Sequence, residues 1–333
     1  MKELQNKTIL FISPRFFGYE QEIKNELELL GAKVIYFDDR PDNKFFTKLL
    51  IRLNFKILIS HKINNYYKNI ITLMQKEKID YLFLNTPETF PIKVLKLIKG
   101  KYPDILVYTY FWDSVYNRKN ALKYLDVSDK YFTFDENDSC LDSRIRFLPL
   151  FYISAYEEIA KYNCDKLYDI AFIGTVHSDR YRILKQIKDI AQKNNLKYFI
   201  YLYSPSKLLF FLQKVFLKDF RRIPLNDISF VPLEKEEVLN IIKKTRSVID
   251  IEHKRQTGLT IRTIEVFGAK RKLITTNKNI KKYDIYNSNN ICVIDKNKLE
   301  INIDFFNNVF TDINQRIYEK YRIKNWLKTI FFN

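Results

Sequence analysis

Cysteine is scarce in this chain. Its 333 residues include three cysteines, Cys140, Cys164 and Cys292, and no CxxC pair. An odd, scattered set of thiols argues against a disulfide scaffold and against a structural zinc site, and it is typical of a reducing compartment. We therefore expect a cytoplasmic protein whose fold is held by hydrophobic cores.

Long apolar runs are also missing. None approaches the roughly 18–20 residues that cross a bilayer, so we expect a chain that does not span a membrane. The opening residues MKELQNKTILFIS are too polar for a signal peptide and predict a first β-strand. The hydrophobic fraction of 46% and the charged fraction of 29% are typical of a globular protein. At roughly 100–200 residues per domain, the length suggests two domains.

Negative charge is in the minority. The sequence has 57 Lys and Arg against 39 Asp and Glu, a net charge of +18. Such an excess favours an anionic partner, namely nucleic acid, a nucleotide or an anionic membrane surface. The alternative is a Lys-rich composition without functional meaning, because the basic residues are spread along the whole chain. A nucleic-acid-binding protein is supported by the net charge and by no other feature of the sequence. Because no RNA-binding motif is present, we do not expect nucleic acid as the partner.

Short apolar runs alternate with amphipathic stretches along the chain. This alternation predicts parallel sheets covered by helices on both faces, an α/β class. The predicted strands are Thr8–Ser13, Lys33–Phe37, Tyr81–Asn85, Ile105–Phe111, Lys130–Phe134, Ile145–Pro149, Asp169–Gly174, Tyr198–Tyr203, Ser247–Ile251, Lys272–Thr276 and Asn290–Ile294. The predicted helices are Glu20–Leu30, Tyr66–Glu77, Pro91–Lys99, Asp179–Lys193, Lys235–Lys244 and Thr260–Ala269.

The strands fall into two series, which predict two doubly wound, Rossmann-like domains. We expect an N-terminal domain over residues 1–155 and a second domain over residues 165–310. Residues 311–333 form a helical C-terminal segment that we expect to pack back toward the first domain. The boundary lies near Phe151–Leu167.

The six glycines occupy informative positions. Gly31 and Gly100 follow helical patterns and are predicted C-caps. Gly18, Gly174 and Gly258 lie near the carboxyl ends of strands, where open α/β sheets bind ligands. Neither GxGxxG nor GxxxxGK[ST] occurs, which argues against a conventional dinucleotide fold and against a P-loop.

Residues 247–277 carry the most informative pattern, a strand, a glycine-containing turn, a helix and a strand. A helix that opens near Gly258–Thr260 directs backbone N–H groups at the turn and predicts a diphosphate site. Lys254 precedes the turn and adds positive charge. Arg262 and Glu265 share a helix face, where the carboxylate can accept two hydrogen bonds from a ribose diol. The alternative for this pair is a surface ion pair.

This stretch resembles the donor-binding element of GT-B-fold glycosyltransferases that use nucleotide sugars. In that resemblance Glu265 falls on the ribose-binding Glu, while Gly258 and Leu259 fall on the phosphate turn, with Thr260 and Arg262 also at the diphosphate. Thr257 stands where the common retaining pattern has a second Glu. The Gly-x-Pro before the last strand is replaced by Lys-Arg-Lys, so a retaining or an inverting reaction both stay open.

The whole chain also resembles a group of bacterial proteins for capsule and lipopolysaccharide biosynthesis. The resemblance implies two domains facing a cleft and transfer of a sugar from a nucleotide-diphosphate donor to a glycan or lipid-linked acceptor. It implies no cofactor and no metal, and a place at the inner face of the cytoplasmic membrane. A non-catalytic sugar-nucleotide-binding partner is a further alternative. The shared motifs are FWDS at 111–114, YFTFD at 131–135, FLPLFY at 147–152, FIGT at 172–175, HSDR at 177–180 and residues 256–265.

Other predicted site residues follow strands. In the second domain, Gly174, His177 and Arg180 would face the donor phosphates, whereas Asp179 is better explained as a helix N-cap.

In the first domain, Arg15 and Gly18 would meet the acceptor, and Glu20 is a candidate base or a charge in a first helical turn. Asp113 is the better candidate base, or a helix cap, and Trp112 would stack on a sugar or pack in the core.

Two further patterns have competing explanations. The acidic pair Asp250 and Glu252 resembles a metal-binding motif, but its place beside the phosphate turn argues against one, and His253 is too isolated for a metal site. The basic amphipathic stretches Lys48–Lys62 and Lys207–Arg222 are typical of interfacial helices that contact an anionic membrane, or of core-facing helices with a solvated face.

Overall fold

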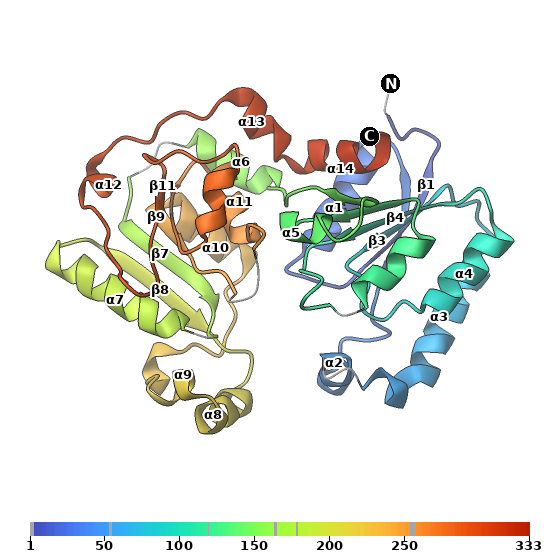
Figure 1. The fold of residues 1–333 in the computed structure, drawn as a ribbon, viewed down its shortest axis with the longest axis horizontal. Coiled ribbons are helices and arrows are strands. Elements are labelled where there is room, and N and C mark those ends of the chain that lie inside the picture. Colours follow the sequence, from blue (N-terminus) through green and yellow to red (C-terminus); the bar gives the residue numbers. More distant parts are fainter. Residues whose placement is uncertain (1–2, 53–54, 119, 163–164, 178, 254–256) are drawn as a thin grey trace. The chain divides into compact units, whose positions relative to one another are not determined.

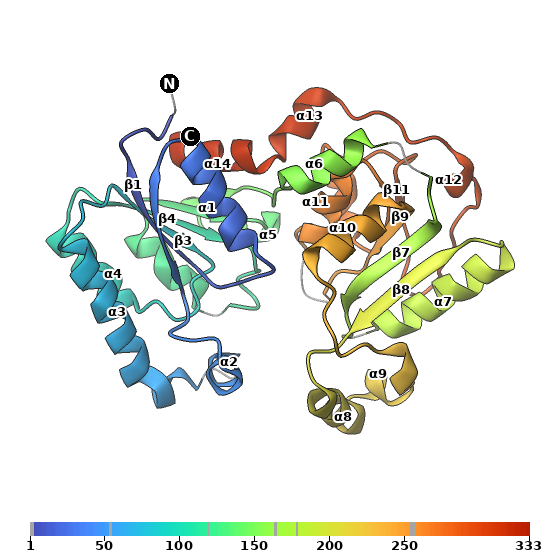
Figure 2. The same cartoon turned by 180° about the vertical axis from the view of Figure 1, so that it is seen from behind.

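Every predicted strand is present in the computed structural model, which describes residues 3–52, 55–118, 120–162, 165–177, 179–253 and 257–333. The chain divides into two compact units, the first made of Met1–Pro149 with Trp326–Asn333 and the second of Leu150–Asn325. Each unit is a parallel sheet flanked by helices (Figures 1 and 2). The α/β class with two Rossmann-like units is therefore confirmed. In the described residues no helix has both the length and the apolar character needed to cross a bilayer.

The first unit contains a six-stranded parallel sheet in the order β2-β1-β3-β4-β5-β6. Its strands are β1 (Thr8–Ser13), β2 (Lys33–Asp38), β3 (Tyr81–Asn85), β4 (Leu106–Phe111), β5 (Lys130–Thr133) and β6 (Ile145–Phe147). Its helical segments are α1 (Tyr19–Leu29), α2 (Phe45–Arg52), η1 (Lys56–Ile59), α3 (Ser60–Met74), α4 (Ile92–Lys101), η2 (Ala121–Val127) and α5 (Glu136–Ser139).

Alternate residues of these strands build the cores on the two faces of the sheet. Leu82 and Leu84 of β3 pack with the buried residues of α3 and α4, which form one apolar cluster. Phe83, from the opposite face of the same strand, contacts Trp326 and Phe331 of α14 (Ile323–Phe332). In Figure 2, α1 lies in front of this sheet. The period-two pattern of the strand thus places one core on each face.

The second unit contains a five-stranded parallel sheet in the order β11-β10-β9-β7-β8. Its strands are β7 (Tyr168–Thr175), β8 (Tyr198–Tyr203), β9 (Thr245–Asp250), β10 (Lys272–Thr275) and β11 (Ile291–Val293). Its helical segments are α6 (Ser154–Lys161), α7 (Arg180–Lys193), α8 (Lys207–Phe216), α9 (Lys218–Arg221), η3 (Leu225–Asp227), α10 (Lys235–Lys243), α11 (Ile261–Gly268), η4 (Lys278–Lys282), α12 (Asp304–Asn307) and α13 (Gln315–Lys320).

Both sheets have the same connectivity. In each, the first strand lies between the second and the third, so the strand order reverses between β1 and β3 in one unit and between β7 and β9 in the other. Open α/β sheets bind ligands beyond the carboxyl ends of the strands at such a switch point. The topology alone therefore marks one candidate position in each unit.

Two local predictions need correction. Gly31 follows the C-cap of α1 with φ of 104°, as predicted, but Gly100 lies inside α4, which continues to Lys101. A helix tolerates a glycine, so its presence near a predicted helix end does not fix where the helix stops. The C-terminal segment 311–333 is not continuously helical either, because residues 311–314 precede α13 and residues 321–322 separate α13 from α14.

Candidate functional site

Arg180 occupies the switch point of the second unit. It is the first residue of α7, and its guanidinium joins the ends of the two strands between which the order reverses. Nε and Nη2 donate to the carbonyl oxygen of Ile251, just after β9, at 3.0 and 2.6 Å. Nη1 donates to the carbonyl oxygen of Thr175, the last residue of β7, at 2.9 Å. A fixed cation therefore lies where this sheet topology places a ligand.

Gly174 makes room for this side chain. A Cβ atom at position 174 would lie 2.8 Å from Cζ of Phe172 and 3.3 Å from Nη1 of Arg180. The guanidinium itself lies over the Phe172 ring, 5.7 Å from its centroid. Since any larger residue at 174 would displace the ring or the guanidinium, the glycine expected to sit at the phosphates has a definite steric role.

The charge of Arg180 has no direct carboxylate partner among the described residues, because its hydrogen bonds go to two carbonyls and the Thr175 hydroxyl. Burial lowers the pKa of Arg180 to about 10, although Asp250 and Glu252 act in the opposite direction. Burying a cation without a contacting counter-charge is costly. An anion bound at this position would offset that cost.

Asp250, the last residue of β9, fixes the start of α11 through hydrogen bonds. Oδ2 of Asp250 accepts hydrogen bonds from the hydroxyls of Thr260 and Thr263 at 2.6 and 2.7 Å. Thr260 Oγ1 also accepts the N–H of Thr263 at 3.2 Å and is the N-cap of the helix. Burial raises the pKa of the Asp250 carboxyl. The Thr260 hydroxyl, predicted to bind phosphate, is therefore already used to fix the helix.

Arg262 and Glu265 lie on one face of α11, as their spacing predicted. Nη1 of Arg262 is 2.7 Å from Oε2 of Glu265. The Glu265 residue is only 4% exposed, so this is not the surface ion pair that the alternative described. Arg262 also influences the pKa of Arg180, which places α11 and the Arg180 guanidinium in one electrostatic environment.

His177 joins the same environment through its ring. The rings of His177 and His253 lie 5.2 Å apart. Burial, with Arg180, His253 and Lys296 nearby, lowers the pKa of His177 to about 3. At neutral pH and in mildly acidic solution the His177 ring is therefore uncharged. In the free protein it offers a hydrogen-bonding group and no positive charge.

The turn before α11 is held by side chains from beyond β10. Nδ2 of Asn277 donates to the carbonyl oxygens of Thr257 and Gly258 at 3.3 and 3.2 Å. Leu259 is 1% exposed and belongs to the core, so it shapes the turn through packing. Lys254, which was predicted to add charge here, lies outside the described residues.

Glu252 is engaged by two groups that the sequence analysis did not single out. Its carboxylate accepts a hydrogen bond from the Thr276 hydroxyl and lies 2.6 Å from Nζ of Lys296, in the loop after β11. The described residues contain no cluster of three His, Cys, Asp or Glu side chains that could hold a metal ion. Asp179 has the position of the α7 N-cap, but its side chain makes no capping hydrogen bond.

In the first unit, charged side chains hold the loop that follows β1. The Glu20 carboxylate accepts the backbone N–H of Phe16 at 3.0 Å, and Gly18, with φ of 79°, is the N-cap of α1. Nε of Arg15 lies 3.4 Å from Oδ2 of Asp38, and its side chain is 68% exposed. Trp112 packs against Phe16 with ring centroids 5.3 Å apart. Trp112 is therefore a neighbour of the loop that the Glu20 carboxylate holds.

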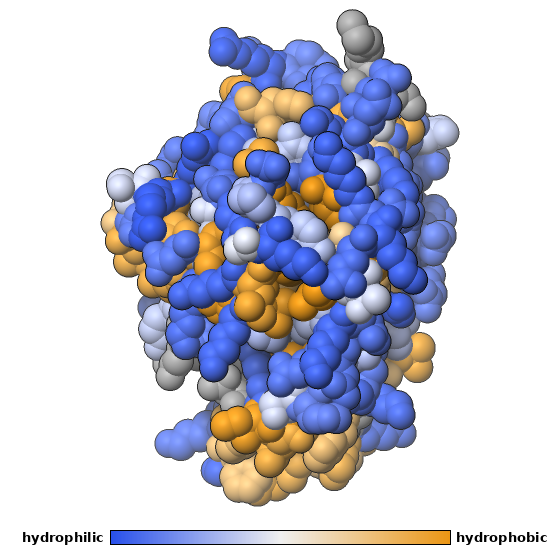
Figure 3. All heavy atoms as spheres, turned by 90° about the vertical axis from the view of Figure 1, so that its right-hand side faces the viewer, coloured by the Kyte–Doolittle hydropathy of each residue, from blue (hydrophilic) through white to orange (hydrophobic). Residues whose placement is uncertain are grey.

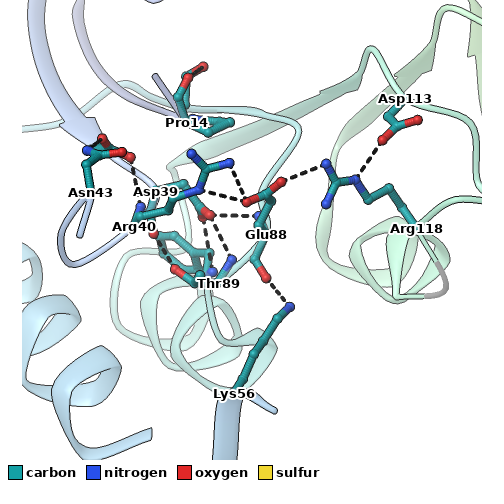
Figure 4. A network of polar contacts seen from close by, with 12 residues as sticks. Pro14, Asp39, Arg40, Asn43, Lys56, Glu88, Thr89, Asp113 and Arg118 are labelled. Carbon is teal, nitrogen blue, oxygen red and sulfur yellow. Dashed lines mark hydrogen bonds and ion pairs between the residues drawn. The ribbon is translucent and has the colours of Figure 1, made fainter. Parts of the chain in front are cut away.

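Asp113 belongs to a larger ion network at the carboxyl edge of the first sheet (Figure 4). Arg118 links two carboxylates, with Nε 2.9 Å from Asp113 Oδ2 and Nη2 2.7 Å from Glu88 Oε1. Arg40 approaches Glu88 from the other side, with Nη2 2.8 Å from Oε2. Burial alone would raise the pKa of Glu88, but the two guanidiniums outweigh it and the pKa lies below its usual value.

A second carboxylate fastens the loop that carries Glu88. Asp39 follows β2 and is fully buried, and its oxygens accept the backbone N–H groups of Glu88, Thr89 and Phe90 at 2.8, 2.7 and 3.1 Å. Burial, reinforced by Glu88, raises the pKa of Asp39 to about 6. Lys56 donates to the Glu88 carbonyl oxygen, so four charged residues, Asp39, Arg40, Lys56 and Arg118, contact this loop.

A pocket of about 590 Å³ opens beside this network. Its charged lining residues are Lys56, Glu88, Arg118 and Lys123. The ring of Tyr116 is exposed, whereas Tyr124 is buried and donates through its hydroxyl to the Phe90 carbonyl oxygen. The volume lies within the range of roughly 300–1,000 Å³ that is usual for small-molecule sites.

Four of these charged residues were not predicted from the sequence, namely Arg40, Glu88, Arg118 and Lys296. Glu88 follows the predicted strand Tyr81–Asn85, just as Asp113 follows the predicted strand Ile105–Phe111. Its position after a strand could therefore have marked Glu88 as a candidate site residue. Lys296 offered no comparable signal, because its partner Glu252 lies 44 positions away in the sequence, and the same holds for the pairing of Arg118 with Glu88 across 30 positions.

Comparisons with known proteins bear on the fold. No family model and no curated protein sequence matches the chain. Among solved structures, a glycosyltransferase from Rickettsia africae ESF-5 is 14% identical with a TM-score of 0.56, over 98% of this chain and 94% of that chain. A Staphylococcus aureus MnaA–UDP structure is 12% identical with a TM-score of 0.50, over 96% of this chain and 90% of that chain.

A third match is the N-terminal domain of trehalose-6-phosphate phosphatase from Candida albicans. It is 11% identical with a TM-score of 0.56, over 99% of this chain and 98% of that chain. At these identities the matches show a shared fold that extends over nearly the whole chain, both units included.

Proposed function

We propose that the protein is a glycosyltransferase that moves a sugar from a nucleotide-diphosphate donor to a glycan or lipid-linked acceptor. The observation that carries the proposal is Arg180, a partly buried cation bonded to carbonyls at the switch point of the second sheet. The fold it shares with a glycosyltransferase and with a protein solved with UDP supports the same class of ligand.

The donor diphosphate would lie between Arg180 and the first turn of α11. Helix N-termini attract anions through their N–H groups and dipole, and Gly258 lets the backbone come close. As the sugar leaves, negative charge grows on the diphosphate, and a fixed cation stabilises it most at that stage. Since the carboxylates of Asp250 and Glu252 are bonded to hydroxyls and to Lys296, this role falls to the chain's cations and we propose no metal.

The ribose would bind at Glu265, one turn into α11. In the free protein Arg262 holds this carboxylate in place. When the donor binds, Arg262 would turn toward the diphosphate, and the released carboxylate would accept the two ribose hydroxyls. The buried position favours this role, because a desolvated charged hydrogen bond is stronger than an exposed one.

The acceptor would bind to the first unit. Its pocket beside Glu88 presents both hydrogen-bonding side chains and the Tyr116 ring, a combination suited to a sugar. Asp113 would accept the proton of the attacking hydroxyl, with Arg118 fixing the orientation of its carboxylate. Glu20 remains the second candidate base, with a carboxylate that also holds the N–H of Phe16.

We further propose that the acceptor belongs to a bacterial surface polysaccharide and that the reaction takes place in the cytoplasm. The support is the resemblance of the motifs from FWDS at 111–114 to HSDR at 177–180 to capsule and lipopolysaccharide proteins.

Substituting Glu265→Gln tests the donor site. We expect the affinity for nucleoside diphosphates to fall about 10- to 100-fold, since hydrogen bonds to charged groups contribute roughly 1.5–3 kcal/mol. The affinity for inorganic pyrophosphate should not change, because it has no ribose. Isothermal titration with UDP, GDP, ADP and pyrophosphate measures both.

Glu157→Gln is the matched control, because Glu157 pairs with Arg322 in the same unit. It should alter neither affinity. Equal losses of nucleotide and pyrophosphate binding in Glu265→Gln would assign a purely structural role to the Arg262–Glu265 pair, and unchanged nucleotide binding would remove Glu265 from the site.

A further inference from the structure

Helix α8 presents its apolar side to solvent. Its only buried residue is Phe210, whereas Phe211, Val215 and Phe216 are 50%, 63% and 75% exposed. The large apolar residues exposed along this helix and just after it are Leu208, Phe211, Leu212, Val215, Phe216 and Leu217. The core-facing alternative for the stretch Lys207–Arg222 is therefore wrong for α8.

The exposed residues form one continuous stripe. Positions 208, 211, 212, 215 and 216 follow the spacing i, i+3, i+4, i+7 and i+8, which places them on one face of a helix. Gln213 and Lys214, which are polar, are only partly exposed. Ordinary surface helices turn such a stripe inward, so α8 has the reverse orientation. Soluble monomers rarely expose apolar patches of this kind without a binding role.

The reverse orientation is fixed by specific contacts. Phe210 packs against Phe220 and Phe230, with ring centroids 6.1 and 6.0 Å apart. Nζ of Lys214 donates to the carbonyl oxygen of Ile223 at 2.8 Å, and the hydroxyl of Ser206 accepts the N–H of Leu209 at 3.3 Å. Since Phe210 and Lys214 tie the helix to its own unit and Ser206 caps its first turn, the apolar stripe is a preformed surface.

Basic residues border the stripe. Lys207 precedes it, and Lys218, Arg221 and Arg222 follow it, all of them exposed. Asp219 is the acidic residue within this segment. We call the stripe and these four cations the α8 surface. Figure 1 labels α8 and α9, which carry this surface, and Figure 3 shows in orange where hydrophobic side chains gather on one face of the protein.

We propose that the α8 surface docks on an anionic lipid bilayer. Apolar side chains on one helix face beside clustered Lys and Arg are the combination by which interfacial helices enter the headgroup region. The charge distinguishes this occupant from a second copy of the chain, because two α8 surfaces would bring eight cations together. The inference rests on α8 and α9 alone and does not depend on the donor site.

The other basic amphipathic stretch, Lys48–Lys62, lacks this charge pattern. Ile57 and Leu58 are exposed there, at 84% and 70%. However, Lys62 pairs with Asp42 and Lys56 donates to the Glu88 carbonyl oxygen. Lys62 is thus paired with a carboxylate and Lys56 is only partly exposed, so the described part of this stretch does not support the same proposal.

Vesicle flotation of the full chain tests the proposal. Vesicles of phosphatidylcholine with about 30% phosphatidylglycerol are compared with vesicles of pure phosphatidylcholine. We expect binding to the anionic vesicles that weakens with salt, and little binding to neutral ones. Lys218→Gln with Arg222→Gln should weaken binding about 30-fold, at roughly fivefold per cation. Phe211→Ser with Phe216→Ser should abolish it.

Helix α4 provides matched controls in exposed positions. Lys93→Gln with Lys96→Gln removes two cations, and Leu97→Ser removes an apolar residue that is 67% exposed. These variants should bind anionic vesicles as the unsubstituted chain does. All the substituted side chains are exposed, so cooperative thermal unfolding should be retained throughout.

Three results would overturn the proposal. The first is the absence of flotation with anionic vesicles, and the second is an equal loss of binding in the α4 controls. The third is a dimer in sedimentation velocity that Phe211→Ser with Phe216→Ser dissociates, which would assign the α8 surface to a second copy of the chain.

Discussion

The two units have the same strand connectivity, but different side chains join the two strands at the switch point of each sheet. In the first unit, Nδ2 of Asn85 donates to Oγ of Ser13 at 3.1 Å, and both residues are fully buried. In the second unit, the guanidinium of Arg180 joins the carbonyl oxygens of Thr175 and Ile251. A neutral hydrogen bond thus occupies the position in one sheet that a cation occupies in the other.

The charges around the two positions differ in the same way. In the first unit the guanidiniums of Arg40 and Arg118 are bonded to carboxylates, so their charge is largely cancelled. In the second unit Arg180 is bonded to carbonyls, so its charge remains available to a ligand. The topology decides where a ligand can bind, and the side chains decide its charge. This difference underlies our assignment of the donor to the second unit and of the acceptor to the first.

The largest effect should come from the candidate base. Asp113→Asn removes the proton acceptor but keeps a partner for Arg118, and general bases contribute roughly 10²- to 10⁴-fold to turnover. We expect a loss of that size in sugar transfer, measured with a radiolabelled donor, while nucleoside diphosphate affinity stays unchanged. Glu20→Gln is the control. If Glu20→Gln abolishes turnover and Asp113→Asn does not, the base is Glu20.

A second variant tests whether the ion pairs of Glu88 stabilise the first unit. Glu88→Ala leaves two arginines without their shared carboxylate, and removing one partner of a buried ion pair typically costs about 3–5 kcal/mol. Urea unfolding should show this loss. Asp142→Ala, which breaks an exposed pair with Arg144, should change the free energy of unfolding far less, because solvent screens that pair. An equally small loss in both variants would mean that the Glu88 network does not stabilise the unit.

Local pattern predicted the sheets well. The strands Thr8–Ser13, Tyr81–Asn85 and Tyr198–Tyr203 have the predicted bounds, because each is a short apolar run between polar segments. The pairing of Arg262 with Glu265 was also foreseeable, since a spacing of three residues places two side chains on one helix face.

Features that depend on distant residues could not be predicted. Glu88 meets Arg40 and Arg118 only after β2, β3 and β4 have been assembled into one sheet. Nothing near Arg180 in the sequence indicates that its guanidinium bonds to Ile251. The helical pattern of Lys207–Phe216 was visible, but whether its apolar stripe faces the core or the solvent depends on Phe220 and Phe230.

The central claim is that Arg180 binds the diphosphate of the donor. Isothermal titration of UDP, GDP and ADP into Arg180→Met tests it most directly, with Arg246→Met as the control, because Arg246 lies in β9 near its opposite end and pairs with Asp169. We predict an affinity about 10- to 100-fold weaker in Arg180→Met, the loss of a charged hydrogen bond, and no change in Arg246→Met. Unchanged affinity in a folded Arg180→Met protein would contradict the account.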